Sequence, residues 1–348
     1  MPQVPVSLLK TGEQLIEDVV TERGNLLFPK GRTITARDIE ILQAFLIKNV
    51  NVEQQLGRKP AEPSPNPNRL RFMDRYDELL ELIKKVFKNA APGISLPIYD
   101  LRKKLEALIE ASEDYRPLYF APHSFQIEDY LYHNSILVAL TSYRLAVWHH
   151  LPKKDHIPVA LGGLLHDIGS FSVDQDLLRK PGKLKPDELQ EIRKHTIIGY
   201  NILKDVPGIN NGVKLCALQH HEREDGSGYP LGVKGDKIHV YTKVVAIADM
   251  FHAMTSDRFH QGKTSPYLVL EKLQDESFGK LDPGMVRTFI RKATEFQNGS
   301  VVRLSDDSVA EIVFSDPVNP TRPLVKINGQ IINLAAARDL YIQEVIQP

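Results

Sequence analysis

Histidine and aspartate side chains, the types that bind divalent metal ions, recur through the middle of the sequence beside apolar segments. They are His166, Asp167, His195, His220, His221 and Asp249. Burying four imidazoles and two carboxylates is unfavourable unless a partner satisfies them. A pair of divalent ions would do so, because a two-metal site needs a bridging carboxylate, outer imidazoles and a water that becomes the nucleophile. We assign the bridging role to Asp167, as a hypothesis about catalysis.

Each of these residues, taken alone, has a simpler interpretation. A single buried histidine such as His195 is usually a hydrogen-bonded core residue, and the pair His220-His221 could end a helix facing solvent. Asp249 could be a buried cap or an ion-pair partner. The set as a whole, with every member beside an apolar helix, favours a metal centre over these separate explanations.

The elements that must position this set lie in a long helical region. Amphipathic patterns in DELLELIKKVFKN and DLRKKLEALIEA predict helices, and SILVALTSYRLAVWHH is apolar nearly all round, as a buried helix would be. Further helices are predicted around VALGGLLHDIG, LQEIRKHTIIGYNILK, GVKLCALQHH and YTKVVAIADMFHAMT. We therefore expect a helical connector over residues 70–124 and a helical domain over residues 125–296.

Smaller units flank this helical region. The proline-rich segment at residues 58–69 cannot hold a helix and predicts a semi-extended linker. Before it, short strand patterns and a helix beginning after Thr35 predict an α+β domain over residues 1–57. Residues 297–348 contain short strand patterns with an Asn-Gly hairpin turn, which predicts a small β-barrel-like domain.

The composition excludes several classes of protein. Of the 348 residues, 42% are hydrophobic and 25% are charged, and 44 basic side chains balance 44 acidic ones. Neutral net charge gives no general attraction to polyanions or anionic lipid, so we expect neither polymeric nucleic acid nor a membrane as a partner. The single cysteine, Cys216, excludes an internal disulfide framework. Neither a run of 18 apolar residues nor a signal-peptide pattern occurs, which predicts a cytoplasmic protein.

Five segments of the helical region together resemble a known family. LLHDIG is followed by LLRKPGKLKPDE, KHTIIGYNIL, QHHEREDGSGYP and ADMFHAMTSDR, and this series is similar to the HD-GYP domain. The resemblance covers residues 125–296 and implies a mainly α fold class: an all-helical HD-type metal-dependent phosphohydrolase core, flanked by the two small domains. It also implies hydrolysis of cyclic di-GMP, a second messenger in bacterial signalling.

The resemblance implies roles for individual residues. It makes metal ligands of all six members of the set above: His166, Asp167, His195, His220, His221 and Asp249. Asp167 would also orient the attacking water, and Arg258 would hold a phosphate of the nucleotide. Gly226, Gly228 and Tyr229 belong to the GYP loop, which would border the substrate and could receive a protein partner. The ligand types suit two divalent ions, with Fe or Mn favoured.

The glycines of that loop also have a physical explanation. A loop that turns beside a ligand needs either positive φ or a close approach of its backbone, and glycine permits both. We therefore expect one of these reasons to apply at Gly226 and at Gly228.

Four positions near the expected site depart from the family pattern. Asn134 stands where the family has its first metal-ligand histidine, and Ser170 stands where a lysine would contact phosphate. His252 replaces the second aspartate of the family's ADxxDA motif, and Gln261 replaces another phosphate-binding cation. A serine supplies no charge, so stabilisation of the substrate is expected to weaken, and Lys180 could compensate.

These features leave three functions open. The first is a metal-dependent phosphodiesterase that converts cyclic di-GMP to linear pGpG and, by a second cleavage, to GMP. The second is a degenerate HD-GYP domain that binds nucleotide or protein without turnover, which Asn134, Ser170 and Gln261 motivate. The third is a phosphohydrolase for another nucleotide, in which the altered phosphate contacts would reflect a different substrate.

Overall fold

The structure, a computed structural model, describes most of the chain. The described residues are 3–6, 9–21, 24–45, 47–53, 67–113, 115–122, 125–180, 182, 184–256, 264–295 and 298–347. Arg258, Gln261 and residues 58–66 of the predicted linker lie outside them, whereas residues 67–69, also predicted as linker, already belong to a helix because proline is tolerated in a first helical turn. The chain divides into two compact units, one formed by residues 1–67 together with 294–348 and the other by residues 68–293.

The first unit begins with short strands and one helix. Its N-terminal elements are β1 (Gln3–Pro5), β2 (Gln14–Leu15), β3 (Val19–Val20), β4 (Leu26–Phe28), α1 (Ala36–Ala44) and β5 (Asn49–Glu53). The strands β1, β5 and β2 form one antiparallel sheet, and β3 pairs with β4. A capping box between Thr35 and Asp38 starts α1, because the two side chains satisfy backbone N–H groups at the helix N-terminus. The predicted helix start after Thr35 is confirmed.

The C-terminal part of this unit is a five-stranded antiparallel sheet. It consists of β6 (Val301–Leu304), β7 (Val309–Phe314), β8 (Leu324–Ile327), β9 (Gln330–Asn333) and β10 (Ile342–Gln347). The strand order is β10-β6-β7-β8-β9, so β10 and β9 lie at opposite edges. The predicted turn joins β8 to β9, where Asn328 (φ 49°) and Gly329 (φ 86°) both have the positive φ that a two-residue hairpin needs. The sequence patterns did not predict β10.

The two β-rich parts of the first unit pack on each other. Val301, Val309 and Ile346 contact the apolar core of the N-terminal part. Arg37 donates a hydrogen bond to the carbonyl oxygen of Gly299 at 3.2 Å. The small domains that the sequence predicts at opposite ends of the chain therefore share one core.

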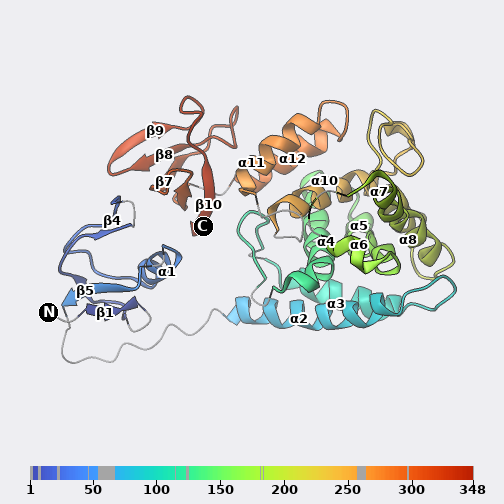
Figure 1. The fold of residues 1–348 in the computed structure, drawn as a ribbon, viewed down its shortest axis with the longest axis horizontal. Coiled ribbons are helices and arrows are strands. Elements are labelled where there is room, and N and C mark those ends of the chain that lie inside the picture. The colour runs from blue at the N-terminus through green and yellow to red at the C-terminus, as the bar shows by residue number, and fades with distance from the viewer. Residues whose placement is uncertain are drawn as a thin grey trace. The chain divides into compact units, whose positions relative to one another are not determined.

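The second unit is helical and contains the predicted connector and the HD-GYP-like region (Figure 1). Its elements are α2 (Pro67–Lys88), α3 (Ile98–Glu110), η2 (Ile127–Asp129), α4 (Tyr130–Trp148), α5 (Lys153–Leu165), η3 (Ile168–Ser172), α6 (Gln175–Arg179), α7 (Pro186–Arg193), α8 (His195–Leu203), α9 (Asn211–Gln219), η4 (Gly235–Lys237), α10 (Val240–Thr255), α11 (Pro266–Glu276) and α12 (Pro283–Thr294). The predicted mainly α fold class is confirmed. Within the described residues, every helix is too short or too polar to cross a membrane.

One apolar core joins the connector helices to the rest of this unit. Leu79 and Ile83 of α2 and Leu101 of α3 are fully buried in the same cluster as Ile136 of α4 and Leu164 of α5. Helix α4 packs against α5 and α10, which explains why its sequence is apolar nearly all round. The connector is therefore an integral part of the helical unit rather than a spacer.

Candidate metal centre

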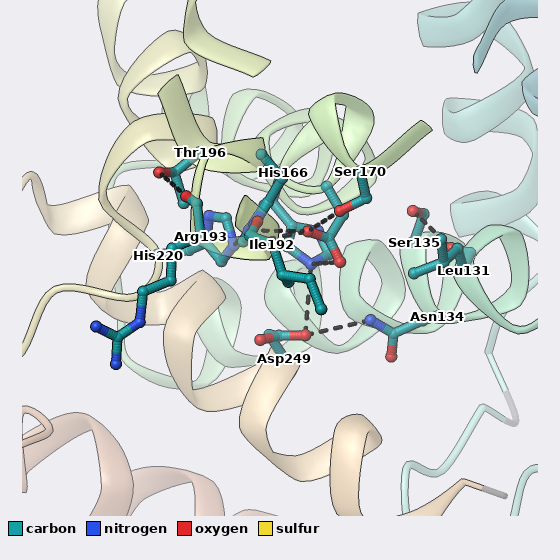
Figure 2. Close-up of polar contacts among 12 residues, drawn as sticks. Leu131, Asn134, Ser135, His166, Ser170, Ile192, Arg193, Thr196, His220 and Asp249 are labelled. Carbon is teal, nitrogen blue, oxygen red and sulfur yellow. Dashed lines mark hydrogen bonds and ion pairs between the residues drawn. The ribbon is translucent and has the colours of Figure 1, made fainter. Parts of the chain in front are cut away.

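Helix α5 and the turn after it place the first two candidate ligands. His166 is fully buried, and its Nδ1 donates a hydrogen bond to the carbonyl oxygen of Gly163 at 2.7 Å. This bond directs Nε2 toward Asp167, whose Oδ2 lies 3.4 Å away, and toward Asp249, whose Oδ1 also lies 3.4 Å away (Figure 2). Among the described residues Nε2 has no hydrogen-bond partner. The imidazole is therefore oriented as a metal ligand would be, with its second nitrogen fixed by the backbone.

His195 and His220 repeat this arrangement from α8 and from the end of α9. Their Nδ1 atoms donate to the carbonyl oxygens of Ile192 (2.7 Å) and Cys216 (2.9 Å). Their Nε2 atoms lie 3.2 Å apart, and both face Asp167 Oδ1, at 3.4 and 3.7 Å. Two nitrogen lone pairs this close repel each other unless a proton or a cation lies between them. The geometry therefore calls for either a shared proton or a bound cation on this side of Asp167.

His221 and Tyr229 complete the cluster. The His221 ring lies 4.1 Å from the His220 ring, and it stacks on Tyr229 with centroids 4.7 Å apart and planes at 26°. Two groups have ligand atoms within 4.8 Å of one another: His195 with His220 and His221, and His166 with Asp167 and His220. The structure therefore brings the six predicted ligands together, and their role as ligands stays a prediction.

The ionisation of these groups suits cation binding. Burial lowers the pKa of His220 to about 3, and burial with the neighbouring imidazoles holds the pKa of His221 well below its usual value. Burial alone would raise the pKa values of Asp167 and Asp249, but His166 outweighs it and lowers both. Burial also opposes protonation of His166, but Asp167 and Asp249 outweigh it and raise the pKa of this imidazole. A metal ion that binds at Nε2 would therefore displace a proton from His166.

Asn134, at the first departure from the family pattern, lies in this cluster. It stands on α4, is 2% exposed, and donates a hydrogen bond from Nδ2 to Asp249 Oδ1 at 3.2 Å (Figure 2). Its own Oδ1 is buried and, within the described part of the chain, lacks a hydrogen-bond partner. The amide thus orients the carboxylate that also faces His166, and it carries a carbonyl oxygen able to accept a donor or a cation.

Asn134→Ala is expected to weaken metal binding about tenfold, because Asp249 loses the hydrogen bond that orients it. The measurement is titration of the chelated protein with Mn²⁺, with the free ion followed by electron paramagnetic resonance. Ser135→Ala is the matched control, since that buried hydroxyl donates only within α4, to the Leu131 carbonyl oxygen. Equal Mn²⁺ affinity in Asn134→Ala and wild type would contradict the orienting role.

Ser170 contacts the cluster directly. Its hydroxyl donates to Asp167 Oδ1 at 3.1 Å, so it orients the candidate bridging carboxylate instead of supplying charge to a phosphate. Lys180, the predicted substitute cation, forms an ion pair with Glu188 at 2.5 Å. Its charge is therefore already matched by a carboxylate.

His252 makes its contacts away from the cluster, although it lies one turn after Asp249 on α10. Its Nε2 lies 2.7 Å from Thr141 Oγ1 and 3.5 Å from the Tyr115 hydroxyl oxygen. Burial lowers the pKa of His252 to about 3, so its ring is neutral in the folded protein. The residue belongs to the buried contact between α4 and α10 rather than to the candidate centre.

His252→Gln is expected to make stability less dependent on acid pH. The folded pKa of His252 is about 3 and its unfolded value is 6.5, so between these values the ring gains a proton only on unfolding. Stability therefore falls as pH drops through this window, by about 1.4 kcal/mol per pH unit. Urea unfolding at several pH values in this window gives the free energy of unfolding as a function of pH. In the variant, this dependence should be weaker by the uptake of about one proton. Identical slopes would show that His252 does not carry the shift.

The GYP loop is fixed by backbone contacts beside the cluster. Gly226 has a φ of 84°, and a Cβ on Gly228 would lie 2.4 Å from Glu222 Cα. The buried carboxylate of Glu222 accepts hydrogen bonds from the backbone N–H groups of Leu231 (2.7 Å) and Val233 (3.1 Å). Positive φ explains the first glycine and close approach explains the second, as predicted.

A cavity of about 620 Å³ opens beside the cluster. Its described lining includes these residues of the predicted set: Asn134, Asp167, Ser170, His195, His220, His221, Tyr229 and Asp249. It also includes polar and charged residues outside the predicted site set: Lys88, Glu128, Gln175, Arg179 and Arg223. Arg223 stands two residues after the histidine pair, and this position in the sequence could have indicated that it lies at the cavity. The others stand in helix-face or loop patterns that are normally solvated.

The central part of the chain matches a protein family. Residues 120–285 match the family model described as the HD domain. The chain is 30% identical over 200 residues to the cyclic di-GMP phosphodiesterase PA4108 of Pseudomonas aeruginosa, covering 58% of this chain and 48% of that protein. It is 37% identical over 142 residues to the 3'3'-cGAMP-specific phosphodiesterase 1 of Vibrio cholerae, covering 40% of this chain and 33% of that protein. These matches span about half or less of the relatives' length.

A solved structure shares the fold over most of the chain. Bd1817, an HDG"Y"P protein from Bdellovibrio bacteriovorus, aligns with a TM-score of 0.51 at 15% identity, covering 83% of this chain and 97% of that one. The helical architecture and the matched family model together define the class, and residues 120–285 form an HD domain. The resemblance carried by the five motifs is thereby confirmed at the level of the HD domain, and the HD-GYP type stays a proposal.

Proposed function

We propose that the protein is a metal-dependent phosphodiesterase that hydrolyses cyclic di-GMP to pGpG, with GMP as the product of a second cleavage. The observation that carries this proposal is the cluster, in which three imidazoles fixed by backbone carbonyls direct Nε2 atoms toward Asp167. The curated relatives are named phosphodiesterases of cyclic dinucleotides, which supports the same substrate class. The adjoining cavity of about 620 Å³ has a volume typical of small-molecule sites.

Two divalent ions, Fe or Mn, fit the donor atoms of the cluster. His195, His220 and His221 would hold one ion, His166 and Asp249 would hold the other, and Asp167 would bridge them. Imidazole and carboxylate donors suit these metals, and the buried Nε2 of His166 otherwise lacks a hydrogen-bond partner among the described residues. Bound there, the ions would supply a hydroxide nucleophile at neutral pH and positive charge to offset that of the phosphate.

The chain's own residues orient the reaction. Asp167 would position the attacking water, and Ser170 holds one oxygen of that carboxylate in place. Arg223 lines the cavity beside the histidine pair and would bind the scissile phosphate, a role predicted also for Arg258 outside the described residues. Burial raises the pKa of Tyr229, so its phenol stays neutral and could donate a hydrogen bond to substrate.

A nucleotide panel tests this proposal. Full-length protein purified without oxygen and loaded with Fe or Mn is incubated with cyclic di-GMP, cGAMP, cyclic di-AMP and pGpG, and bound metal is counted in the same samples. We expect cyclic di-GMP to be converted to pGpG. Turnover of a different nucleotide alone would contradict the assigned substrate and favour the third function left open by the sequence.

A non-catalytic module that binds nucleotide or protein is the second candidate function. The observation in its favour is that Asn134 supplies an amide where the family pattern has a histidine, and that this amide is engaged by Asp249. The GYP loop, where Leu231 is 58% exposed, would then be the surface for a protein partner. Binding of cyclic di-GMP with two ions present and no product in the panel would favour this function.

A further inference from the structure

The cavity beside the metal cluster extends to residues that take no part in the cluster. They come from α2, η2, α4, η3 and α6 and are called here the distal end: Lys88, Glu128, Tyr132, Phe171 and Arg179. Lys88 stands outside residues 120–285, the part of the chain that matches the HD domain. The connector therefore contributes to a cavity whose other residues belong to that domain.

Aromatic rings form a fixed wall at the distal end. The Tyr132 and Phe171 rings stack with centroids 4.7 Å apart and planes at 28°, and Phe87 lies 5.2 Å from Phe171. Phe87 is 1% exposed, so the end of α2 is anchored in the core. The backbone at Lys88, the next residue, is therefore held in place, and its exposed side chain lines the cavity.

The cationic side chains near the distal end differ in whether a carboxylate pairs with them. Lys84 and Lys180 are each held by a carboxylate, at 2.8 and 2.5 Å, and neither belongs to the described cavity lining. Lys88 and Arg179 do line the cavity, and in the described part of the chain neither forms an ion pair. The two cations free to meet a ligand are thus the two that face the cavity.

We propose that Lys88 and Arg179 bind the second, non-scissile phosphate of a cyclic dinucleotide, an inference that rests on the proposed function. Such a ligand carries two phosphodiester anions on one ring, and only one of them is attacked at the cluster in a given step. A guanidinium and an ammonium group are the side chains that best complement the other anion. Glu128 also lines the distal end, and among the described residues no ion pair joins it to either cation.

Charge-neutralising variants test this inference. Lys88→Gln and Arg179→Gln are compared with Lys84→Gln and Lys180→Gln, which remove neighbouring cations already paired with carboxylates. Each distal-end variant is expected to raise the KM for cyclic di-GMP about tenfold with little change in kcat, and to raise the Kd of the metal-free full chain, measured by calorimetry, by a similar factor. The two controls should have the KM and Kd of the wild-type protein. Lys88→Arg keeps the positive charge, so it should also bind cyclic di-GMP with the wild-type Kd.

Substrates of different size and base separate the possible outcomes. Hydrolysis of bis(p-nitrophenyl) phosphate, which has one phosphodiester, should be unchanged in all variants. An equal loss on this substrate would place the effect at the metal cluster and overturn the inference, as would an unchanged KM and Kd for cyclic di-GMP. A loss confined to guanine-containing substrates would assign the distal end to a base instead. Absence of cyclic dinucleotide turnover by wild type would contradict the proposed function, and the calorimetric Kd values would still decide this inference.

Discussion

Asp167→Ala is expected to lower the rate of cyclic di-GMP hydrolysis by at least about 10³-fold. Asp167 faces the Nε2 atoms of His166, His195 and His220 at 3.4, 3.4 and 3.7 Å, so among the described residues it is the carboxylate that contacts three of the candidate ligands. Its removal takes away the bridging position and the group that would orient the attacking water. The measurement is the initial rate at saturating metal, with bound metal counted in parallel.

Asp187→Ala is the matched control for this variant. Asp187 is an exposed carboxylate in the first turn of α7, so the same change of side chain there should leave rate and metal content unaltered. The fold of both variants is compared by circular dichroism. An Asp167→Ala protein that is folded and hydrolyses cyclic di-GMP within tenfold of wild type would contradict the role assigned to this residue.

Gly169→Ala is expected to destabilise the protein by about 3 kcal/mol or more. A Cβ on Gly169 would lie 2.0 Å from the carbonyl oxygen of His195 and 2.5 Å from the backbone nitrogen of Gly199. Backbone atoms cannot move aside as the end of a side chain can, so η3 and α8 must separate. Because this contact brings Asp167 and His195 together, we expect metal affinity to fall along with stability.

Gly284→Ala provides the control for the glycine substitution. Near the start of α12, an added Cβ would lie 3.3 Å from Asp282 Oδ1 and 3.8 Å from His149 Cε1, both side-chain atoms at ordinary or slightly tight distances, so this change should cost far less than the one at Gly169. Urea unfolding gives the free energy of unfolding for both variants, and Mn²⁺ titration gives the metal affinity. Wild-type stability in Gly169→Ala would contradict the close packing of η3 on α8.

The clustering of the six histidines and aspartates and the helical architecture were predictable because both leave a pattern in the sequence. Histidines and aspartates beside apolar helices are costly to bury, and the structure places all six within one cluster. The helix start after Thr35 and the turn at Asn328-Gly329 follow from local backbone chemistry, which the sequence records directly.

Contacts between distant segments were not predictable in the same way. Nothing in the local sequence indicates that Asn134 donates to Asp249, 115 positions away, or that His252 meets Thr141 instead of the cluster. Lys88 and Arg179 have the pattern of solvated side chains, and only tertiary packing brings them to one cavity. Such pairings depend on how helices pack, and helix periodicity alone does not encode them.

The most direct test of this account is cyclic di-GMP hydrolysis by the full-length wild-type protein as metal is returned to it. The protein is first stripped with a chelator and then titrated with Fe or Mn under anaerobic conditions, with pGpG quantified at each step. We expect no product without metal and a rate that rises until about two ions per chain are bound. A rate independent of metal, or no hydrolysis with two ions bound, would contradict a two-metal phosphodiesterase.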